Sequence, residues 1–152
     1  RGRANTPRTG ALIVVANLAP EIERSHSHVS VDAPRPVVGR WDRFRLEQVV
    51  GNLVQNALKF GLGKPIEAAV DATDGRATLE VTDHGLGVAP DQREAIFEPF
   101  TRAVSIRHYG GLGLGLSIVR AIVQRYGGSV HVEPQEGGGS TFVVELPLAK
   151  AS

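Results

Sequence analysis

The chain has 152 residues, and its 17 lysines and arginines nearly balance its 16 aspartates and glutamates, giving a formal net charge of +1. This length suits one domain with a hydrophobic core, and the balanced charge excludes binding to nucleic acid or an anionic membrane by bulk electrostatics. The sequence contains no cysteine, which excludes disulfides and thiolate metal sites. It also contains no methionine, which leads us to expect a piece of a longer protein. It has no transmembrane run and no signal peptide, so we expect a soluble chain without direct membrane contact.

The first part of the chain carries weak structural signals. Residues 1–10 are basic and aperiodic, which predicts a tail or linker before a single domain at residues 11–150. Residues 11–24 allow either helix or turn. Alternating side chains predict a strand at residues 28–32 and a second short strand at residues 34–38.

A long amphipathic helix is predicted over residues 46–60. Its polar residues Asn52, Asn56 and Lys59 fall at i, i+4 and i+7, so a helix places all three on one stripe. Taken singly, each suits a solvated helix surface, and Lys59 also suits a helix C-terminus. Together they present two carboxamides and a cation to one small anionic target, and magnesium bound to phosphate oxygens suits that description. The neighbouring apolar stripe comprises Leu46, Val49, Val50, Leu53 and Ala57.

The residues after this helix predict a β-hairpin. Residues 66–70 and 77–81 alternate between apolar and polar side chains, and Asp74 with Gly75 supplies a turn between them. The second strand of the hairpin ends directly at Asp83.

The rest of the chain predicts two further helices and two further strands. Residues 91–100 suit a short helix, and residues 101–109 suit a mobile loop. Residues 114–126 have apolar side chains spaced by four and end at two glycines, which predicts a helix. Strands are predicted at residues 129–133 and 140–146, with a glycine-rich turn between them.

A run of glycines comes directly before the second of these helices. Gly111, Gly113 and Gly115 leave backbone N–H groups accessible at the helix start, where a phosphate can approach them. A tight turn, in which glycine serves only the backbone geometry, explains the run equally well when it is taken alone. The run is not a dinucleotide fingerprint, which follows a strand early in a βαβ unit, nor a Walker loop, which needs Gly-Lys-Ser or Gly-Lys-Thr.

A second candidate site lies at Asp83, just before Gly85 and Gly87. A carboxylate there can accept a hydrogen bond from an exocyclic amine, and the glycines let a flat ring lie against the backbone, which predicts an adenine site. The alternative is a turn aspartate that caps local N–H groups. The five histidines show no shared metal-ligand spacing with carboxylates and are interpreted as surface or strand residues.

Over about residues 41–148, the sequence resembles the catalytic ATP-binding domain of sensor histidine kinases from two-component signalling. The resemblance rests on four motifs in order and on typical closing segments at residues 126–128 and 138–148. The motifs are the asparagine box at residues 52–60 (NLVQNALKF), the first glycine box at residues 83–88 (DHGLGV), the phenylalanine box at residues 96–102 (IFEPFTR) and the second glycine box at residues 111–118 (GLGLGLSI).

The resemblance implies an α+β fold: a two-layer α/β sandwich of the Bergerat ATP-binding type, with a mixed β-sheet backed by helices. ATP would lie under a lid between the phenylalanine box and the second glycine box. Asp83 would bind the adenine amine, and Phe60 would pack on the ring. The other implied cofactor-binding positions include Gly85, Gly87, Gly111, Leu112, Gly113, Leu114, Gly115, Leu116 and Thr141.

The resemblance also implies the residues at the phosphate end of the site. Asn56, with Asn52, would organise Mg²⁺, while Lys59 and Arg102 would meet phosphate oxygens. In the related ATPases of gyrase, chaperone and mismatch-repair type, a glutamate base lies four residues before the asparagine that matches Asn56. Here that position is Asn52, and a carboxamide cannot accept a proton in that role, so we expect phosphoryl transfer rather than hydrolysis.

The phosphoacceptor histidine of such kinases lies in a motif of His, Glu or Asp, and then Arg-Thr-Pro, and no histidine of this chain has that context. The leading hypothesis is therefore a cytoplasmic, monomeric catalytic domain that passes the γ-phosphoryl of Mg-ATP to a histidine on the dimerisation domain of the same protein. A response regulator would act downstream. The rival hypothesis is a nucleotide-sensing module in which ATP moves the lid and no transfer occurs.

Overall fold

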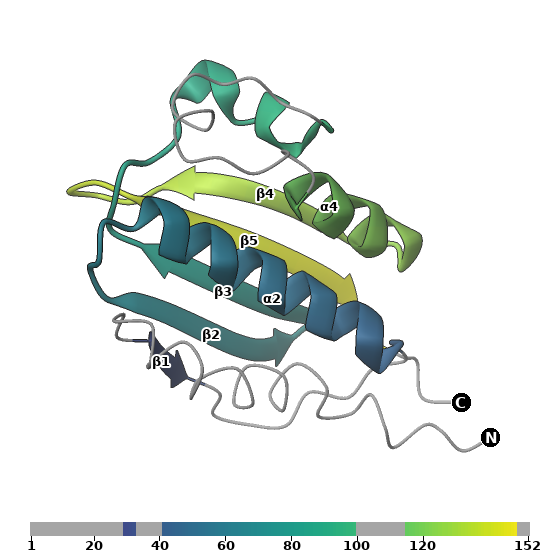
Figure 1. Ribbon diagram of the computed structural model, residues 1–152. Helices are drawn as coiled ribbons and strands as arrows, with labels where there is room; N and C mark the ends of the chain where they lie inside the picture. The colour runs from purple at the N-terminus through teal and green to yellow at the C-terminus, as the bar shows by residue number, and fades with distance from the viewer. Residues whose placement is uncertain (1–28, 33–40, 100–114, 149–152) are drawn as a thin grey trace.

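The computed structural model describes residues 29–32, 41–99 and 115–148 of the chain. These residues form a five-stranded sheet with two α-helices, α2 and α4, over one of its faces (Figure 1). The strands are β1 (Val29–Asp32), β2 (Ile66–Thr73), β3 (Arg76–Asp83), β4 (Ser129–Pro134) and β5 (Ser140–Pro147).

The sheet is mixed, and its strand order is β1-β2-β3-β5-β4. Strand β1 pairs parallel with β2, whereas the other three pairs of neighbours are antiparallel. One layer of helices on one mixed sheet is the α+β sandwich expected from the sequence, so the fold prediction is confirmed.

The β2–β3 hairpin forms as its pattern predicts. Its register pairs Thr73 with Arg76, which leaves Asp74 and Gly75 as a two-residue turn. Both turn residues have positive φ, 51° and 77°, which is the conformation that an Asp-Gly turn supplies most readily. The buried face of the hairpin consists of Ile66, Ala68, Val70, Ala77, Leu79 and Val81.

Helix α2 (Arg43–Phe60) begins three residues earlier than the apolar stripe predicts. The reason is Asp42, whose carboxylate accepts hydrogen bonds from the backbone N–H groups of Phe44 at 2.8 Å and Arg45 at 3.4 Å. This is an N-cap, which satisfies donors that the first turn of a helix leaves unpaired. All five residues of the predicted apolar stripe are buried in the core.

Helix α4 (Gly115–Arg125) lies beside α2 and ends at the two glycines, as expected. Gly127 has a φ of 81°, and the N–H of Gly128 donates to the Val123 carbonyl at 2.9 Å. This arrangement ends the helix with a C-terminal cap, in which a left-handed residue reverses the direction of the chain.

A hydrogen bond joins the start of α2 to the end of α4, because the Asp42 N–H donates to the Tyr126 hydroxyl at 2.7 Å.

The prediction of one helix over residues 91–100 is wrong. The chain instead forms two 3₁₀ turns, η3 (Pro90–Gln92) and η4 (Ala95–Phe97). Glu98 stands before Pro99 and takes an extended conformation with ψ of 145°, because proline disfavours helical geometry in the residue before it. Burial of Ile96 and Phe97 then fixes the second turn against the core.

Several predictions concern residues outside the described part of the chain: the tail at residues 1–10, the segment at residues 11–24, the strand at residues 34–38 and the loop at residues 101–109. They stay predictions. Among the described residues, none of the helices has the length and apolar character needed to cross a bilayer.

Candidate nucleotide-binding site

Asn52, the first residue of the asparagine box, faces the start of α4. Asn52 and Asn56 are half-buried and Lys59, in the last turn, is exposed. The side-chain nitrogen of Asn52 donates to the carbonyl oxygen of Gly115 at 3.2 Å. Gly115 is the first residue of α4, so the asparagine box and the described end of the second glycine box meet in space.

Asp83 ends β3 on the face of the sheet that the helices cover. The residue is only 2% exposed, and its Oδ1 accepts the Gly85 N–H at 2.9 Å. Burial raises the pKa of this carboxyl, while backbone hydrogen bonds from Gly85 and Ser140 and the nearby His84 act in the opposite direction. The aspartate therefore does cap a local N–H group, as the alternative interpretation predicts.

That capping role does not exclude ligand binding at Asp83. A carboxylate offers about four lone-pair positions, so two backbone donors leave acceptor capacity for a further donor. A buried carboxylate with a raised pKa is also a common feature of functional sites. Both interpretations of Asp83 are therefore compatible with its geometry.

Gly85 brings the first glycine box against the end of α2. A Cβ atom at this position would overlap the Phe60 carbonyl oxygen and the Cα of Gly61. The next residue, Leu86, donates its N–H to the same Phe60 carbonyl at 3.0 Å. Phe60, half-buried at the end of α2, and Asp83 consequently lie at one corner of the molecule, where an adenine site was predicted.

Gly139 closes the same corner from the β4–β5 turn. A Cβ atom there would overlap the backbone carbonyl of Asp83, so this position also admits only glycine. Gly87 has a φ of 76° and approaches the backbone of Gly139. Glycine is thus required here by close backbone contacts, in addition to any role toward a ligand.

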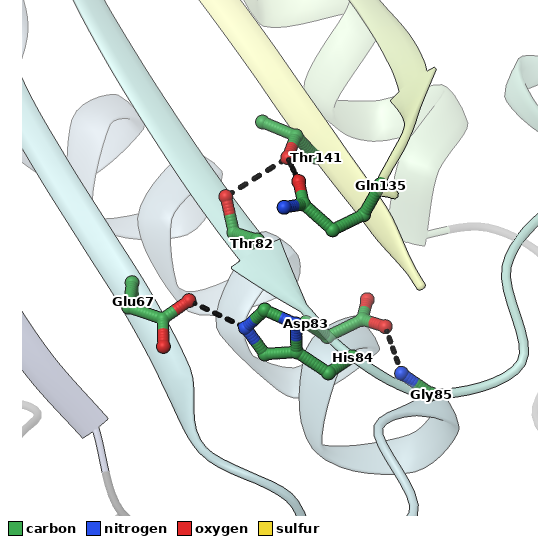
Figure 2. A network of polar contacts seen from close by, with 7 residues as sticks. All are labelled: Glu67, Thr82, Asp83, His84, Gly85, Gln135 and Thr141. Carbon is green, nitrogen blue, oxygen red and sulfur yellow. Dashed lines mark hydrogen bonds and ion pairs between the residues drawn. The ribbon is translucent and has the colours of Figure 1, made fainter. Parts of the chain in front are cut away.

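Thr141 does not lie beside Asp83. Its hydroxyl is within hydrogen-bonding distance of the Thr82 hydroxyl at 2.9 Å and donates to Gln135 Oε1 at 3.0 Å (Figure 2). Thr82 and Thr141 are cross-strand partners, and alternation along β3 puts Thr82 on the face opposite to Asp83. The structure therefore separates the Thr141 hydroxyl from the Asp83 carboxylate.

The residue opposite Asp83 in the register is Ser140, which sequence reasoning missed. Ser140 is buried, and its backbone hydrogen bond acts on the Asp83 carboxyl. Counting back by two from Phe142 and Val144, which are apolar and buried, would have placed Ser140 on this face.

Of the remaining predicted positions, one belongs to the hydrophobic core and five lie outside the part of the chain that the structure describes. Leu116 is buried and belongs to the hydrophobic core, so its side chain serves packing. The structure does not describe Arg102, Gly111, Leu112, Gly113 and Leu114. Among the described residues, no group of three or more histidine, aspartate and glutamate side chains could hold a metal ion.

The two described histidines are paired with glutamates on the sheet. His84 Nε2 lies 2.8 Å from Glu67 Oε1, and His131 Nε2 lies 2.9 Å from Glu133 Oε2. Their interpretation as surface or strand residues is confirmed for these two, while the structure does not describe the other three.

Residues 41–150 match the family of histidine kinase-, DNA gyrase B- and HSP90-like ATPases. Among curated proteins, the autoinducer 2 sensor kinase/phosphatase LuxQ of Vibrio parahaemolyticus is 41% identical over 115 residues, which cover 70% of this chain and 13% of LuxQ. Sensor protein RstB of Escherichia coli is 43% identical over 105 residues, covering 68% of this chain and 24% of RstB. The chain thus spans a small part of the length of these relatives.

Solved structures of histidine kinases share the fold. Full-length ShkA in complex with AMPPNP has a TM-score of 0.78 and 32% identity, covering 94% of this chain and 30% of ShkA. The nucleotide-free catalytic domain of histidine kinase ThkA also has a TM-score of 0.78. Its identity to this chain is 26%, and the match covers 93% of this chain and 93% of the ThkA domain.

Proposed function

The chain belongs to the family of histidine kinase-, DNA gyrase B- and HSP90-like ATPases, and we propose that it transfers the γ-phosphoryl group of Mg-ATP to a histidine of another domain. It would do so as the catalytic ATP-binding domain of a sensor histidine kinase. The acceptor would be the dimerisation domain of the same protein, and a response regulator would take the phosphoryl group from there.

The observation that carries the proposal is the buried Asp83 carboxylate at the corner formed by β3, the end of α2 and the β4–β5 turn. Burial of an aspartate is unfavourable unless its acceptor sites are used, and a site in a family of ATPases offers the exocyclic amine of adenine as the further donor. We therefore assign Asp83 to the adenine amine and Phe60, at the same corner, to packing on the ring.

The phosphate end would lie where α2 meets the start of α4. The Asn52–Gly115 hydrogen bond joins the two helices there, and a helix start favours anions because its N–H groups are unpaired. Lys59 adds a cation at the end of the same stripe. Arg102 and the glycines of the second glycine box, outside the described residues, complete the proposed set.

The donor set around Asn52 and Asn56 fits a magnesium ion. Mg²⁺ prefers oxygen ligands, keeps several waters and binds through few protein groups together with substrate phosphates, so it needs no carboxylate cluster. The carboxamide oxygen of Asn56, with that of Asn52, would hold it. Bound there, the ion would neutralise negative charge on the phosphate oxygens.

Position 52 supports transfer rather than hydrolysis. Asn52 has no basic group to take a proton from water, and its nitrogen already donates to Gly115. Phosphoryl transfer depends mainly on positioning and on charge stabilisation, which these residues can supply. In the step itself, the bond from the γ-phosphorus to the bridging oxygen breaks, a bond to the acceptor nitrogen forms, and ADP leaves.

The proposed partners follow from the absence of a phosphoacceptor motif in this sequence. No histidine of the chain lies in a phosphoacceptor motif, and the relatives that match it are sensor proteins several times longer. We propose that the acceptor domain belongs to the same protein. Because ATP is the donor, we place the reaction in the cytoplasm, and we expect the isolated domain to be a monomer.

The test combines the chain with its own dimerisation domain, supplied as a separate polypeptide. With γ-labelled ATP, the chain alone should bind nucleotide and remain unlabelled, while the added domain should acquire acid-labile, base-stable phosphate. An unlabelled partner in the presence of ATP binding would overturn the transferase assignment and favour the nucleotide-sensing module.

A further inference from the structure

The turn that follows β3 carries two side chains that point in opposite directions (Figure 2). The Asp83 carboxylate faces the Gly85 N–H, while the His84 ring faces β2 and places its Nε2 2.8 Å from Glu67 Oε1. Side chains of successive residues in an extended strand alternate between its faces. Asp83 is therefore directed toward the proposed adenine site, and His84 lies on the other face of the sheet.

Backbone packing fixes this turn from the helix side. Gly85 has no room for a side chain against Phe60 and Gly61, and the Leu86 N–H donates to the Phe60 carbonyl. The far end of the turn is therefore anchored to the last residues of α2, independently of His84.

The His84–Glu67 contact holds the turn from the sheet side. The paired register of β2 and β3 reaches Glu67 and Thr82 at this end of the hairpin, and His84 lies two residues further on. A side-chain contact between Glu67 and His84 is thus diagonal across the two strands, a spacing that long side chains can bridge. It extends the connection between the strands past the last register pair.

We propose that His84 and Glu67 form a positioning pair that sets the direction of the Asp83 carboxylate toward the exocyclic amine of adenine. The inference rests on the proposed ATP-binding function. His84 connects Asp83 to Gly85, so a change in its backbone angles rotates the carboxylate relative to the α2 corner. Hydrogen bonds weaken steeply as their angle departs from linear, so such a rotation lowers the affinity for the amine.

The His84–Glu67 pair should not affect binding of the phosphate end of the nucleotide. Asn52 and Asn56 lie on α2, and Gly115 starts α4, so neither group depends on the turn after β3. His84 is consequently a determinant of base recognition rather than of nucleotide binding in general. This distinction separates a positioning role from a loss of folding, which would weaken every nucleotide alike.

The size of the effect follows from the exposure of the pair. The His84 and Glu67 side chains are 34% and 47% exposed, and polar side-chain pairs at such exposed positions change equilibrium constants by up to about fivefold. We expect the pair to tune the Asp83–amine hydrogen bond within that range.

The chain supplies a matched control. His131 and Glu133 form the same kind of contact on β4, with the Nε2–Oε2 distance at 2.9 Å and side-chain exposures of 48% and 56%. This second pair lies on β4, an edge strand separated from β2 by β3 and β5, so its loss removes a similar surface interaction without affecting the turn.

The experiment measures the affinities of the full chain for ATP and for purine riboside triphosphate, which lacks the 6-amino group, by calorimetry. His84→Ala should weaken ATP about two- to fivefold and leave the affinity for the analogue unchanged. Glu67→Ala should give the same change, and the double variant should be no weaker than either. His84→Gln, which keeps a side-chain nitrogen able to donate to Glu67, should recover ATP affinity, and His131→Ala should change neither affinity.

Two results would overturn the inference: equal losses for ATP and the analogue in His84→Ala, or ATP affinity unchanged in both His84→Ala and Glu67→Ala. These results differ from a failure of the proposed function itself. In that case the wild-type chain would bind ATP no better than the analogue, and Asp83→Asn would not alter the ratio of the two affinities.

Discussion

At the residue scale, the Asp83 carboxylate is almost inaccessible to solvent and accepts backbone N–H groups from Gly85 and Ser140. Burial disfavours the charged form of a carboxyl group, whereas the two backbone donors favour it. The net result is a raised pKa, so desolvation outweighs the hydrogen bonds. A further donor from a ligand would complete the hydrogen bonding of this group.

The adenine assignment predicts that Asp83→Asn weakens ATP binding. Loss of a hydrogen bond to a charged group costs about 1.5–3 kcal/mol, which corresponds to a drop in affinity of roughly tenfold or more. Calorimetric titration with ATP measures it. Asp74→Asn is the matched control, because Asp74 is exposed in the hairpin turn at φ of 51°, a conformation that asparagine tolerates. Equal ATP affinity in wild type and Asp83→Asn would remove Asp83 from the adenine site.

The raised pKa of Asp83 predicts a specific pH dependence of stability. Because the folded state binds the Asp83 proton more tightly than the unfolded state does, this group stabilises the fold in acid, and that contribution is lost as pH rises from the ordinary aspartate range through the raised pKa. The free energy of unfolding of wild type, relative to that of Asp83→Asn, should therefore fall across this interval. Urea denaturation of both proteins at a series of pH values checks the sign, and a relative stability that rises with pH would contradict it.

The same titration of Asp83 should change the affinity for ATP in the opposite direction to the free energy of unfolding. The ionised carboxylate accepts a hydrogen bond from the adenine amine more strongly than the protonated carboxyl group does, so ATP affinity should decline as pH falls through the raised pKa of Asp83. Asp83→Asn should lack this decline. Calorimetry of the two proteins at matched pH values separates the effect from protonation of ATP itself, which is common to both.

At the element scale, α2 joins the core to both ends of the site. Its apolar stripe packs on the sheet, Asn52 contacts the start of α4, and its last residues contact the first glycine box. A glycine beside this helix and a glycine inside it therefore have different roles. Gly85 is confined by the helix backbone, whereas Gly51, inside the helix, has open space where a Cβ atom would be.

This difference predicts opposite effects of the same substitution. Gly85→Ala should lower the free energy of unfolding by about 1–3 kcal/mol or more, because the turn must move away from α2. Gly51→Ala should raise it by about 0.5–1 kcal/mol, because alanine loses less conformational freedom than glycine in a helix interior. Denaturant unfolding of both variants measures the two changes. A loss of stability in Gly51→Ala would show that the position is more confined than its surroundings indicate.

At the scale of the whole molecule, the proposed function assigns recognition of the base and phosphoryl transfer to separate regions. The base would be held at the corner of β3 and the end of α2, while the metal and phosphates would lie between α2 and the start of α4. The helices themselves are joined at their other ends by the hydrogen bond from the Asp42 N–H to the Tyr126 hydroxyl. This arrangement allows the transfer step to be removed while the base site stays intact.

Asn56→Ala should therefore abolish transfer to the dimerisation domain and leave much of the ATP affinity. Without the Asn56 carboxamide, the metal would no longer be placed to neutralise charge on the moving phosphoryl group. Labelling of the partner domain and calorimetry with ATP measure the two properties separately. Gln55→Ala, an exposed position on the same helix, serves as the control. Normal labelling in Asn56→Ala would contradict the assignment of the metal site.

Local sequence patterns determined most of the fold. The spacing of apolar residues in α2 identified a buried face, the Asp74-Gly75 pair identified the hairpin, and two glycines identified the end of α4. Each of these features depends on residues within a few positions of one another, so periodicity and backbone preference were sufficient. The order of the four boxes led to the family in the same way, because it is a property of the sequence.

Only the tertiary structure decided which of these residues meet. Thr141 was assigned to the cofactor-binding set by resemblance, and that assignment stays a prediction; the register of β3 and β5 pairs Thr141 with Thr82 and puts Ser140 opposite Asp83. The His84–Glu67 contact joins residues 17 positions apart, and the Asn52–Gly115 bond joins residues 63 apart. Periodicity assigns each residue to a face of its own element, whereas contacts of this kind depend on strand register and helix packing, which the core as a whole fixes.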